Sequence, residues 1–195
     1  MIYNFEPSEI EIWLTNFVGH TLLRKYYESF IRSLAIDEND QILDFGCGSG
    51  IISKKIAQSL KSGHLTYIDV SSKWLSITKR RLRTNKNTKG YQINNFTSQF
   101  SDVRFDKIIV HYTLHDFPRI YLKPIIKQLL GHLHTTGSLI IREPIDIKHG
   151  ISLYEIRQLL ECFDDVMPKY QIHCNEIMGD SVEIICNFKN LIKNT

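Results

Sequence analysis

The sequence predicts an α/β fold in which a mostly parallel sheet carries helices on both faces. Short runs of apolar, β-prone residues alternate along the chain with amphipathic helical patterns. A glycine-rich turn joins the first of these runs to the first helical pattern that follows it. The last two runs are separated only by a short loop with Gly179-Asp180, which favours an antiparallel pair at one edge of the sheet. At 195 residues the chain is expected to form one domain over residues 1–195.

The predicted elements follow in order. Apolar residues at helical spacing from Ile10 onward predict one or two helices within residues 7–35, ahead of the first strand. Three consecutive apolar residues, Ile108, Ile109 and Val110, make 105–111 the clearest prediction of a buried strand. Ser71 or Ser72 is expected to cap the helix that follows the second strand. The predicted strands are 41–45, 65–69, 91–94, 105–111, 138–143, 169–174 and 181–188, and the helices between them are 51–60, 72–83, 121–133 and 152–163.

Composition narrows the class of protein. A hydrophobic fraction of 43% and a charged fraction of 23% are ordinary for a globular domain, and a net charge of +3 gives no concentrated basic field, so a nucleic-acid partner is not expected. The first residues do not show the basic stretch followed by an apolar stretch that is typical of a secretion signal. No apolar run approaches the length of a membrane span. We therefore expect a cytoplasmic protein with four reduced cysteines, no membrane partner and no metal. A homodimer stays open.

The strongest local signal is Leu43-Asp44-Phe45-Gly46-Cys47-Gly48-Ser49-Gly50, between a predicted strand and a predicted helix. Glycines let the backbone turn sharply and approach a ligand, and the helix that follows offers free N–H groups. Asp69 stands nineteen residues after Gly50, at the end of the second strand, where a carboxylate can bind the hydroxyls of a ribose. The pattern predicts a nucleoside-cofactor site at the carboxyl edge of a parallel sheet.

The loop favours a cationic cofactor over a dinucleotide. The dinucleotide fingerprint is G-x-G-x-x-G, and Ile51 stands where its third glycine belongs. Asp44 would repel a pyrophosphate but could help to hold an ammonium group. S-adenosylmethionine has an α-amino group and a sulfonium and no phosphate. A nicotinamide-dependent oxidoreductase is accordingly disfavoured.

Residues 42–50 resemble the first motif of the class I S-adenosylmethionine-dependent methyltransferases, and the resemblance extends over about residues 30–190. Ile68-Asp69-Val70-Ser71 is similar to the second motif, and Phe105 to Val110, with Leu114-His115 after it, resembles the fourth strand. The resemblance implies a Rossmann-like, doubly wound seven-stranded sheet of order 3-2-1-4-5-7-6, with the last strand antiparallel. It also implies that S-adenosylmethionine is held by Asp44, Gly46, Cys47, Gly48, Gly50, Asp69, Val70, Trp74, Asn94, Asn95, Phe96 and His111, with the choice between the two asparagines at the adenine left open.

Candidates for proton transfer follow the fourth strand. His115 is the first choice as a general base and His111 the second, because an unperturbed imidazole titrates near neutral pH. A packing role for His115 is the alternative. Glu143, at the end of the fifth strand, could orient an acceptor or pair with Arg142.

The expected function is transfer of a methyl group from S-adenosylmethionine to a small-molecule acceptor. The fourth strand runs into His111-Tyr112-Thr113-Leu114 and lacks the N/D-P-P-Y/F motif typical of enzymes that methylate nucleobase amino groups. The N-terminal helices, about residues 7–35, are expected to pack on or over the cofactor site. The alternative function is a non-catalytic methyltransferase-like subunit that acts through a protein partner.

Overall fold

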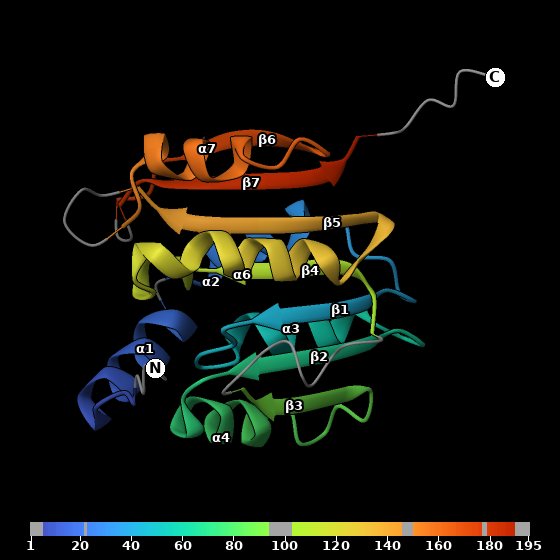
Figure 1. Cartoon of the computed structure of the whole chain (residues 1–195). Coiled ribbons are helices and arrows are strands. Elements are labelled where there is room, and N and C mark those ends of the chain that lie inside the picture. The colour runs from blue at the N-terminus through green and yellow to red at the C-terminus, as the bar shows by residue number, and fades with distance from the viewer. Residues whose placement is uncertain (1–5, 22, 94–102, 146–149, 177–178, 190–195) are drawn as a thin grey trace. The chain divides into compact units, whose positions relative to one another are not determined.

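The computed structural model describes residues 6–21, 23–93, 103–145, 150–176 and 179–189 (Figure 1). The chain separates into two compact units, Met1–Ser101 and Asp102–Thr195. Each unit consists of strands with helices packed against them.

The first unit has a three-stranded parallel sheet in the order β3-β2-β1. α2 packs on α3 and α3 on α4, while α3 and α4 also contact β2. The glycine loop follows β1, and Asp69 ends β2, so both lie at the carboxyl edge of this sheet (Figure 1). The elements are α1 (Glu9–Thr21), α2 (Arg24–Ser33), β1 (Gln41–Phe45), α3 (Ile51–Ser59), β2 (His64–Asp69), α4 (Ser72–Arg81) and β3 (Thr88–Gln92).

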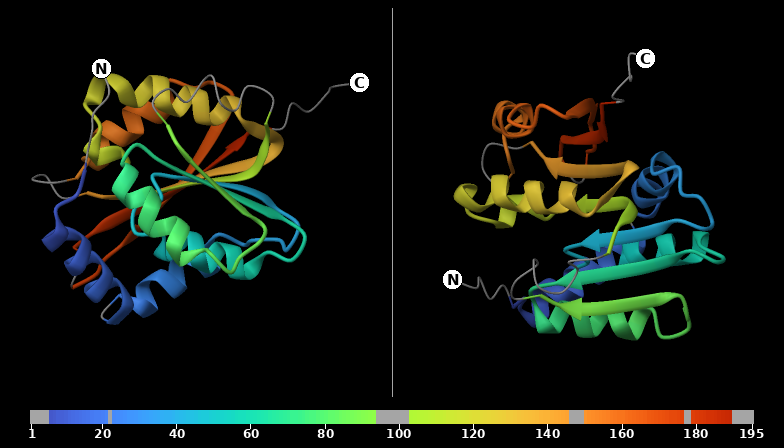
Figure 2. Two further views of the ribbon diagram at one scale, coloured as in Figure 1. Left: turned by 90° about the horizontal axis from the view of Figure 1, so that it is seen from below. Right: turned by 45° about the vertical axis from the view of Figure 1, so that its right-hand side comes forward.

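The second unit has four strands in the order β4-β5-β7-β6. β4 and β5 are parallel, and β7 runs antiparallel to both β5 and β6. α6 packs on β5 and α7 on β6 (Figure 2). The elements are β4 (Phe105–His111), the 3-10 helix η1 (Leu114–Asp116), α6 (Arg119–Gly131), β5 (Leu133–Pro144), α7 (Leu153–Glu161), β6 (Val166–His173) and β7 (Ser181–Phe188).

The strands that were predicted from continuous apolar runs are confirmed. β1, β4 and β7 have the predicted bounds, and β7 is the predicted antiparallel strand. Ile42, Ile108 and Ile109 are fully buried, as expected for strands covered on both faces. Ser71 is the cap of α4, because its side chain accepts a hydrogen bond from the Trp74 N–H.

Four strands differ from their predicted bounds. β2 begins one residue early, at His64, and β6 spans Val166–His173 and not 169–174. β3 spans Thr88–Gln92 and not 91–94, because this strand is half exposed and has a polar sequence without an apolar alternation. β5 begins at Leu133, five residues early, and takes in Thr135-Thr136-Gly137, which was expected to be a loop. A β-bulge between Phe105 and Lys107 accommodates this extension.

The N-terminal region forms two separate helices, α1 and α2. The apolar residues of α1 are spaced to share one face, yet Ile10 is 78% exposed and Trp13 64% exposed, with Leu14 and Phe17 more than half exposed. Trp13 and Phe17 stack on each other, with ring centroids 5.4 Å apart. In the described parts of the chain, no helix is long and apolar enough to cross a membrane.

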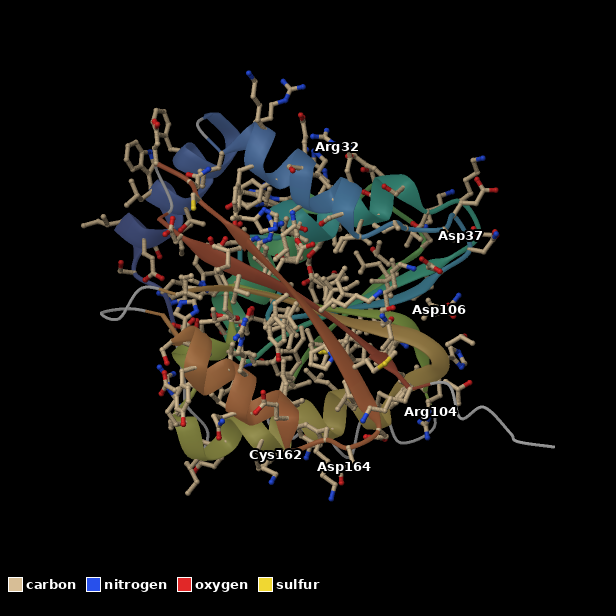
Figure 3. All side chains as sticks on the ribbon, turned by 90° about the horizontal axis from the view of Figure 1, so that it is seen from above. Arg32, Asp37, Arg104, Asp106, Cys162 and Asp164 are labelled. Atoms are coloured by element: carbon tan, nitrogen blue, oxygen red, sulfur yellow. The ribbon has the colours of Figure 1, made fainter. Side chains whose placement is uncertain are left out.

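The four cysteines are free thiols. Cys47 and Cys186 are buried, whereas Cys162 and Cys174 are exposed. Cys162 caps the carboxyl end of α7, where Figure 3 shows it close to Asp164.

Candidate cofactor and catalytic site

The glycine loop of the first unit needs glycine for two different reasons. Gly48 has a φ of +49°, a left-handed conformation that side chains disfavour, and no atom lies within 4 Å of the Cβ position above it. Gly50 has a φ of +74°, and a Cβ there would lie 2.5 Å from Oγ1 of Thr78. The Thr78 hydroxyl in turn donates to the Gly48 carbonyl at 2.8 Å. The loop is therefore held against α4, with open space on its Gly48 side.

Hydrogen bonds fix this loop to the end of β2. The N–H groups of Gly46 and Cys47 both donate to the Ile68 carbonyl, at 2.9 and 3.0 Å. The Gly48 N–H donates to Oδ2 of Asp69 at 2.9 Å. Hydrogen bonds thus join the two sequence motifs, the glycine loop and the end of β2, which lie about twenty residues apart in the chain.

Asp69 accepts hydrogen bonds from both the glycine loop and the start of α4. Only 7% of its surface is exposed, and its Oδ1 accepts the Ser71 N–H at 2.9 Å. Burial raises the pKa of Asp69, the N–H groups of Ser71 and Gly48 oppose this, and the charge of Glu6 adds to it. Each carboxylate oxygen has two lone pairs, so both can accept a further hydrogen bond from a ribose hydroxyl.

Asp44 is a second buried carboxylate beneath the loop. It is 2% exposed, and the buried Ser53 hydroxyl donates to it at 2.5 Å. Burial raises the pKa of Asp44 to about 7, against the effect of the Ser53 hydrogen bond and with a contribution from the charge of Asp69. A cationic ligand would counter the two contributions that raise this pKa, burial and the charge of Asp69, because it supplies an opposite charge next to the carboxylate.

These observations fit S-adenosylmethionine. The loop offers an open backbone surface at Gly48, Asp69 offers carboxylate oxygens, and Asp44 favours a positive charge. Cys47, between the loop glycines, is 7% exposed, and burial raises the pKa of its thiol, so the residue acts as a small apolar group.

The remaining residues that were predicted to bind the cofactor fall into two groups. Val70 and Trp74 are half buried and flank the start of α4, directly after Asp69. The Val70 carbonyl accepts a hydrogen bond from Nε2 of Gln92 at 3.1 Å. Asn94, Asn95 and Phe96 lie outside the described residues, so their assignment to the adenine stays a prediction.

The second unit has a strained turn of its own after β4. Tyr112 has a φ of +52°, which is unfavourable for an aromatic residue, and it is held there because its N–H donates to the Arg142 carbonyl at 2.8 Å. Its ring stacks on His111, with ring centroids 4.7 Å apart, and meets His115 edge to face. The turn thus gathers three aromatic side chains at the end of the strand.

Glu143 holds this turn from the end of β5. Its carboxylate is completely buried and accepts the N–H groups of Thr113 and Leu114, at 2.8 and 2.7 Å. It also lies 2.7 Å from Nδ1 of His115 and accepts the His115 N–H at 3.3 Å. A carboxylate acceptor at Nδ1 places the proton on that nitrogen, so a neutral His115 ring presents its Nε2 lone pair.

The two candidate bases differ in basicity. Burial alone would lower the pKa of His115, but the hydrogen bond and charge of Glu143 outweigh it and raise the pKa above its usual value. Burial and the charge of Arg142 lower the pKa of His111 to about 3. His115 therefore holds a proton more tightly than a free imidazole does, and His111 remains a neutral ring that lines the turn.

Glu143 pairs with His115 and not with Arg142. Arg142 forms a buried ion pair with Glu183 on the neighbouring strand β7, and its Nη2 also lies 3.3 Å from Nε2 of His173. Among the described residues no group of three or more His, Cys, Asp or Glu side chains is placed to hold a metal ion.

Sequence reasoning missed three residues of the first unit. Ser53 on α3 donates to Asp44, and its position one turn beyond the glycine motif could have indicated it. Thr78 on α4 donates to the Gly48 carbonyl, and no local pattern marks it, because its partner lies thirty residues away. Glu6 hydrogen-bonds to the start of α4. No local pattern marks Glu6, because its partners lie more than sixty residues away.

Taken together, the elements and the loop define an α/β protein with a nucleoside-cofactor site. The family model described as "Methyltransferase domain" matches residues 42–137. "Putative methyltransferase YrhH" of Bacillus subtilis is 30% identical over 124 residues, which cover 63% of this chain and 68% of that protein. The chain belongs to the class I S-adenosylmethionine-dependent methyltransferases, whose cofactor is S-adenosylmethionine.

Other relatives are longer than this chain. "Uncharacterized protein MJ0906" of Methanocaldococcus jannaschii is 30% identical over 171 residues, which cover 84% of this chain but 45% of that protein. "Ribosomal RNA small subunit methyltransferase C" of Erwinia tasmaniensis is 32% identical over 102 residues, which cover 51% of this chain and 30% of that protein. The chain thus spans less than half the length of these two relatives.

Solved structures share the fold. The N-methyltransferase NodS of Bradyrhizobium japonicum, in complex with S-adenosyl-L-homocysteine, matches with a TM-score of 0.71 at 18% identity, over 85% of this chain and 86% of that one. The Rossmann-like, seven-stranded fold class predicted from the sequence is confirmed by this likeness and by the strand order within each unit.

Proposed function

We propose that this chain transfers the methyl group of S-adenosylmethionine to a small-molecule acceptor that carries a removable proton, such as a hydroxyl. The observation that carries the proposal is the contact between Glu143 and His115. A histidine ring held at Nδ1 by a buried carboxylate, with a raised pKa, is suited to general base catalysis.

Each residue of the candidate site has a separate role in the proposed methyl transfer. S-adenosylmethionine supplies a methyl group that its sulfonium already activates. Asp44, Asp69 and the glycine loop bind and orient that cofactor. His115, which belongs to the second unit, would take up the acceptor's proton at Nε2 as the acceptor oxygen took the methyl group and S-adenosylhomocysteine was left. Glu143 stabilises the imidazolium that results.

A small acceptor is supported by charge. The net charge is +3, and the one dense basic stretch, Lys79-Arg80-Arg81, forms the last turn of α4, where cations favour the helix dipole. A nucleic-acid acceptor would call for a broader basic surface.

The first test is calorimetric titration with S-adenosylmethionine and S-adenosylhomocysteine. Wild-type protein should bind both, and Asp69→Asn should weaken binding at least tenfold, because an amide has a single acceptor oxygen for the N–H groups and ribose hydroxyls that Asp69 serves. Asp164→Asn is the matched control, since Asp164 is exposed just beyond α7 (Figure 3). Well-folded protein that binds neither compound would disprove the enzyme proposal.

The acceptor class is tested next, by release of S-adenosylhomocysteine. Panels of hydroxyl, thiol, amine and carboxylate compounds are compared with structured RNA. Turnover of a small hydroxyl compound that is lost in His115→Asn supports the proposal. Turnover of RNA alone would overturn the small-molecule assignment.

A second candidate function rests on α1. Its face of Ile10, Trp13, Leu14 and Phe17 is exposed, and a contiguous apolar face is typical of surfaces that bind other proteins. A non-catalytic subunit of this kind would bind cofactor but turn over no acceptor by itself. Turnover would be seen only after the protein partner was added.

A further inference from the structure

The Glu6 carboxylate accepts four hydrogen bonds at the start of α4. Oε1 accepts the Ser72 N–H at 2.8 Å and the Ser72 hydroxyl at 2.9 Å. Oε2 accepts the Ser71 hydroxyl at 2.9 Å and the Lys73 N–H at 3.1 Å. A carboxylate at a helix N-terminus, with both oxygens occupied, is a specific contact and not a casual surface approach.

Ser71 connects this contact to the nucleoside site. Its hydroxyl donates to Glu6, and its N–H donates to Oδ1 of Asp69 at 2.9 Å. Ser71 is completely buried, so it has little freedom to move independently of either carboxylate. A change in the position of Glu6 is therefore transmitted to Asp69 through one residue.

A second tether holds the same segment. The Lys73 ammonium donates to the Pro7 carbonyl at 3.1 Å, and it lies 3.8 Å from Glu9 at the first position of α1. Residues 6–9 are thus fixed to α4 at both ends, and α1 begins directly from this attachment.

The charge of Glu6 is stable over a wide range of pH. Burial would raise the pKa of Glu6, but the hydrogen bonds from Ser72, Ser71 and Lys73 outweigh it and lower the pKa. The carboxylate is therefore ionised, and accepts all four hydrogen bonds, throughout the neutral range.

We propose that Glu6 is a positioning residue of the nucleoside site, and that cofactor binding and docking of residues 6–9 on α4 are coupled through Ser71. The inference rests on the proposed function, because the site it acts on is that of the cofactor. By thermodynamic linkage, docking of this segment strengthens cofactor binding by the same factor by which cofactor strengthens docking.

The test compares Glu6→Gln with wild-type protein in calorimetric titration with S-adenosylhomocysteine. The amide keeps the size of the side chain but lacks the second acceptor oxygen, and we expect the Kd to rise about tenfold, within the usual range for coupled sites. Glu9→Gln is the matched control on the same segment. The Glu9 side chain is 85% exposed and has an ion pair with Lys73 at 3.8 Å. The Kd of the Glu9→Gln variant should therefore stay within twofold of the wild-type value.

A second measurement separates positioning from general loss of structure. Trp13 and Trp74 are the two tryptophans of the chain, so in a Trp74→Phe background the emission reports on α1 alone. Because Trp74 is itself a predicted cofactor residue, the Kd of this background is measured first and the emission is compared at saturating ligand. S-adenosylhomocysteine should change the Trp13 emission in that background, and the change should disappear when Glu6→Gln is added.

The outcomes are distinct. Equal Kd values for wild type and Glu6→Gln overturn this inference and leave the proposed function standing. If Glu6→Gln unfolds, Ser72→Ala, which removes one of the four hydrogen bonds, must raise the Kd instead, and an unchanged Kd there overturns the inference. Failure of the wild type to bind would remove the proposed function and this inference together.

Discussion

Asp44 shows what a single buried carboxylate costs the folded protein in stability. Its pKa is raised by burial to about 7 in the folded chain, against an ordinary value of 3.8. A carboxyl group with a raised folded pKa binds its proton more tightly when folded. Its ionisation therefore removes stability as pH rises from about 4 through about 7.

Replacement of Asp44 with Asn should make the ligand-free protein more stable at pH 8, on the order of a few kcal/mol, because a neutral amide avoids the cost of a buried charge and can still accept the Ser53 hydrogen bond. The difference from wild type should shrink toward zero at pH 4.5. Urea unfolding at the two pH values measures this, and cofactor affinity should fall in the same variant. Equal stability of the two proteins at pH 8 would contradict the burial argument.

The pH dependence of turnover tests His115. Because the pKa of His115 is raised above 6.5 and the neutral ring is the active form, kcat/KM should rise with pH and level off above that pKa. Glu143→Gln removes the charge that raises the pKa, so the rising limb should move to lower pH. We expect His115→Asn to lose at least about 100-fold in rate.

His134 provides the control for this profile. It is an exposed histidine on β5, and His134→Asn should leave both the rate and the pH limb unchanged. A limb that stays in place in Glu143→Gln would show that another group titrates.

At the scale of elements, apolar patterns predicted the strands that are buried and misplaced those that are not. β1 and β4 were predicted to the residue because they consist of apolar runs that only a covered strand can bury. β3 is polar and half exposed, so its bounds depend on pairing with β2. β5 extends through Gly137 because β4 pairs with it across a bulge, and no local signal in the sequence encodes such a partner.

The glycine loop makes a prediction about stability, with a glycine at the end of α6 as its control. Gly50→Ala should destabilise the protein by about 1–3 kcal/mol, because it combines a positive φ with a contact of 2.5 Å to Thr78 on α4. Gly131→Ala, at the end of α6, should be neutral or stabilising by up to about 1 kcal/mol, since nothing lies within 4 Å of its Cβ position. Thermal unfolding of both variants measures the contrast, which fails if Gly50→Ala is as stable as wild type.

At the scale of the whole molecule, the chain consists of two compact units, whereas its length predicts a single domain. If the units fold together, calorimetry should show one transition, and S-adenosylhomocysteine at 100 times its Kd should stabilise the whole of it by about 2.7 kcal/mol. If they fold separately, ligand should shift only the transition that contains Asp69. Two unfolding transitions, one of which keeps the same midpoint temperature with and without ligand, would contradict the single-domain prediction.

The candidate site was predictable where its signal is local. The glycine loop and Asp69 follow strand ends, and their spacing alone indicates a nucleoside. The roles of Glu6 and Glu143 were not predictable, because each depends on N–H groups that only the folded chain brings to it: Ser72 for Glu6, and Thr113 and Leu114 for Glu143. Sequence patterns indicate side chains that alternate or repeat, and they carry no information about which backbone donors a carboxylate will find.

The raised pKa of Asp44 also means that cofactor binding should release protons. With a pKa of about 7, Asp44 carries roughly half a proton in the ligand-free chain at neutral pH. A cation bound beside it would expel that half proton into solution. The heat of cofactor binding should then depend on the ionisation enthalpy of the buffer, so the same titration in phosphate and in Tris would count the protons that leave.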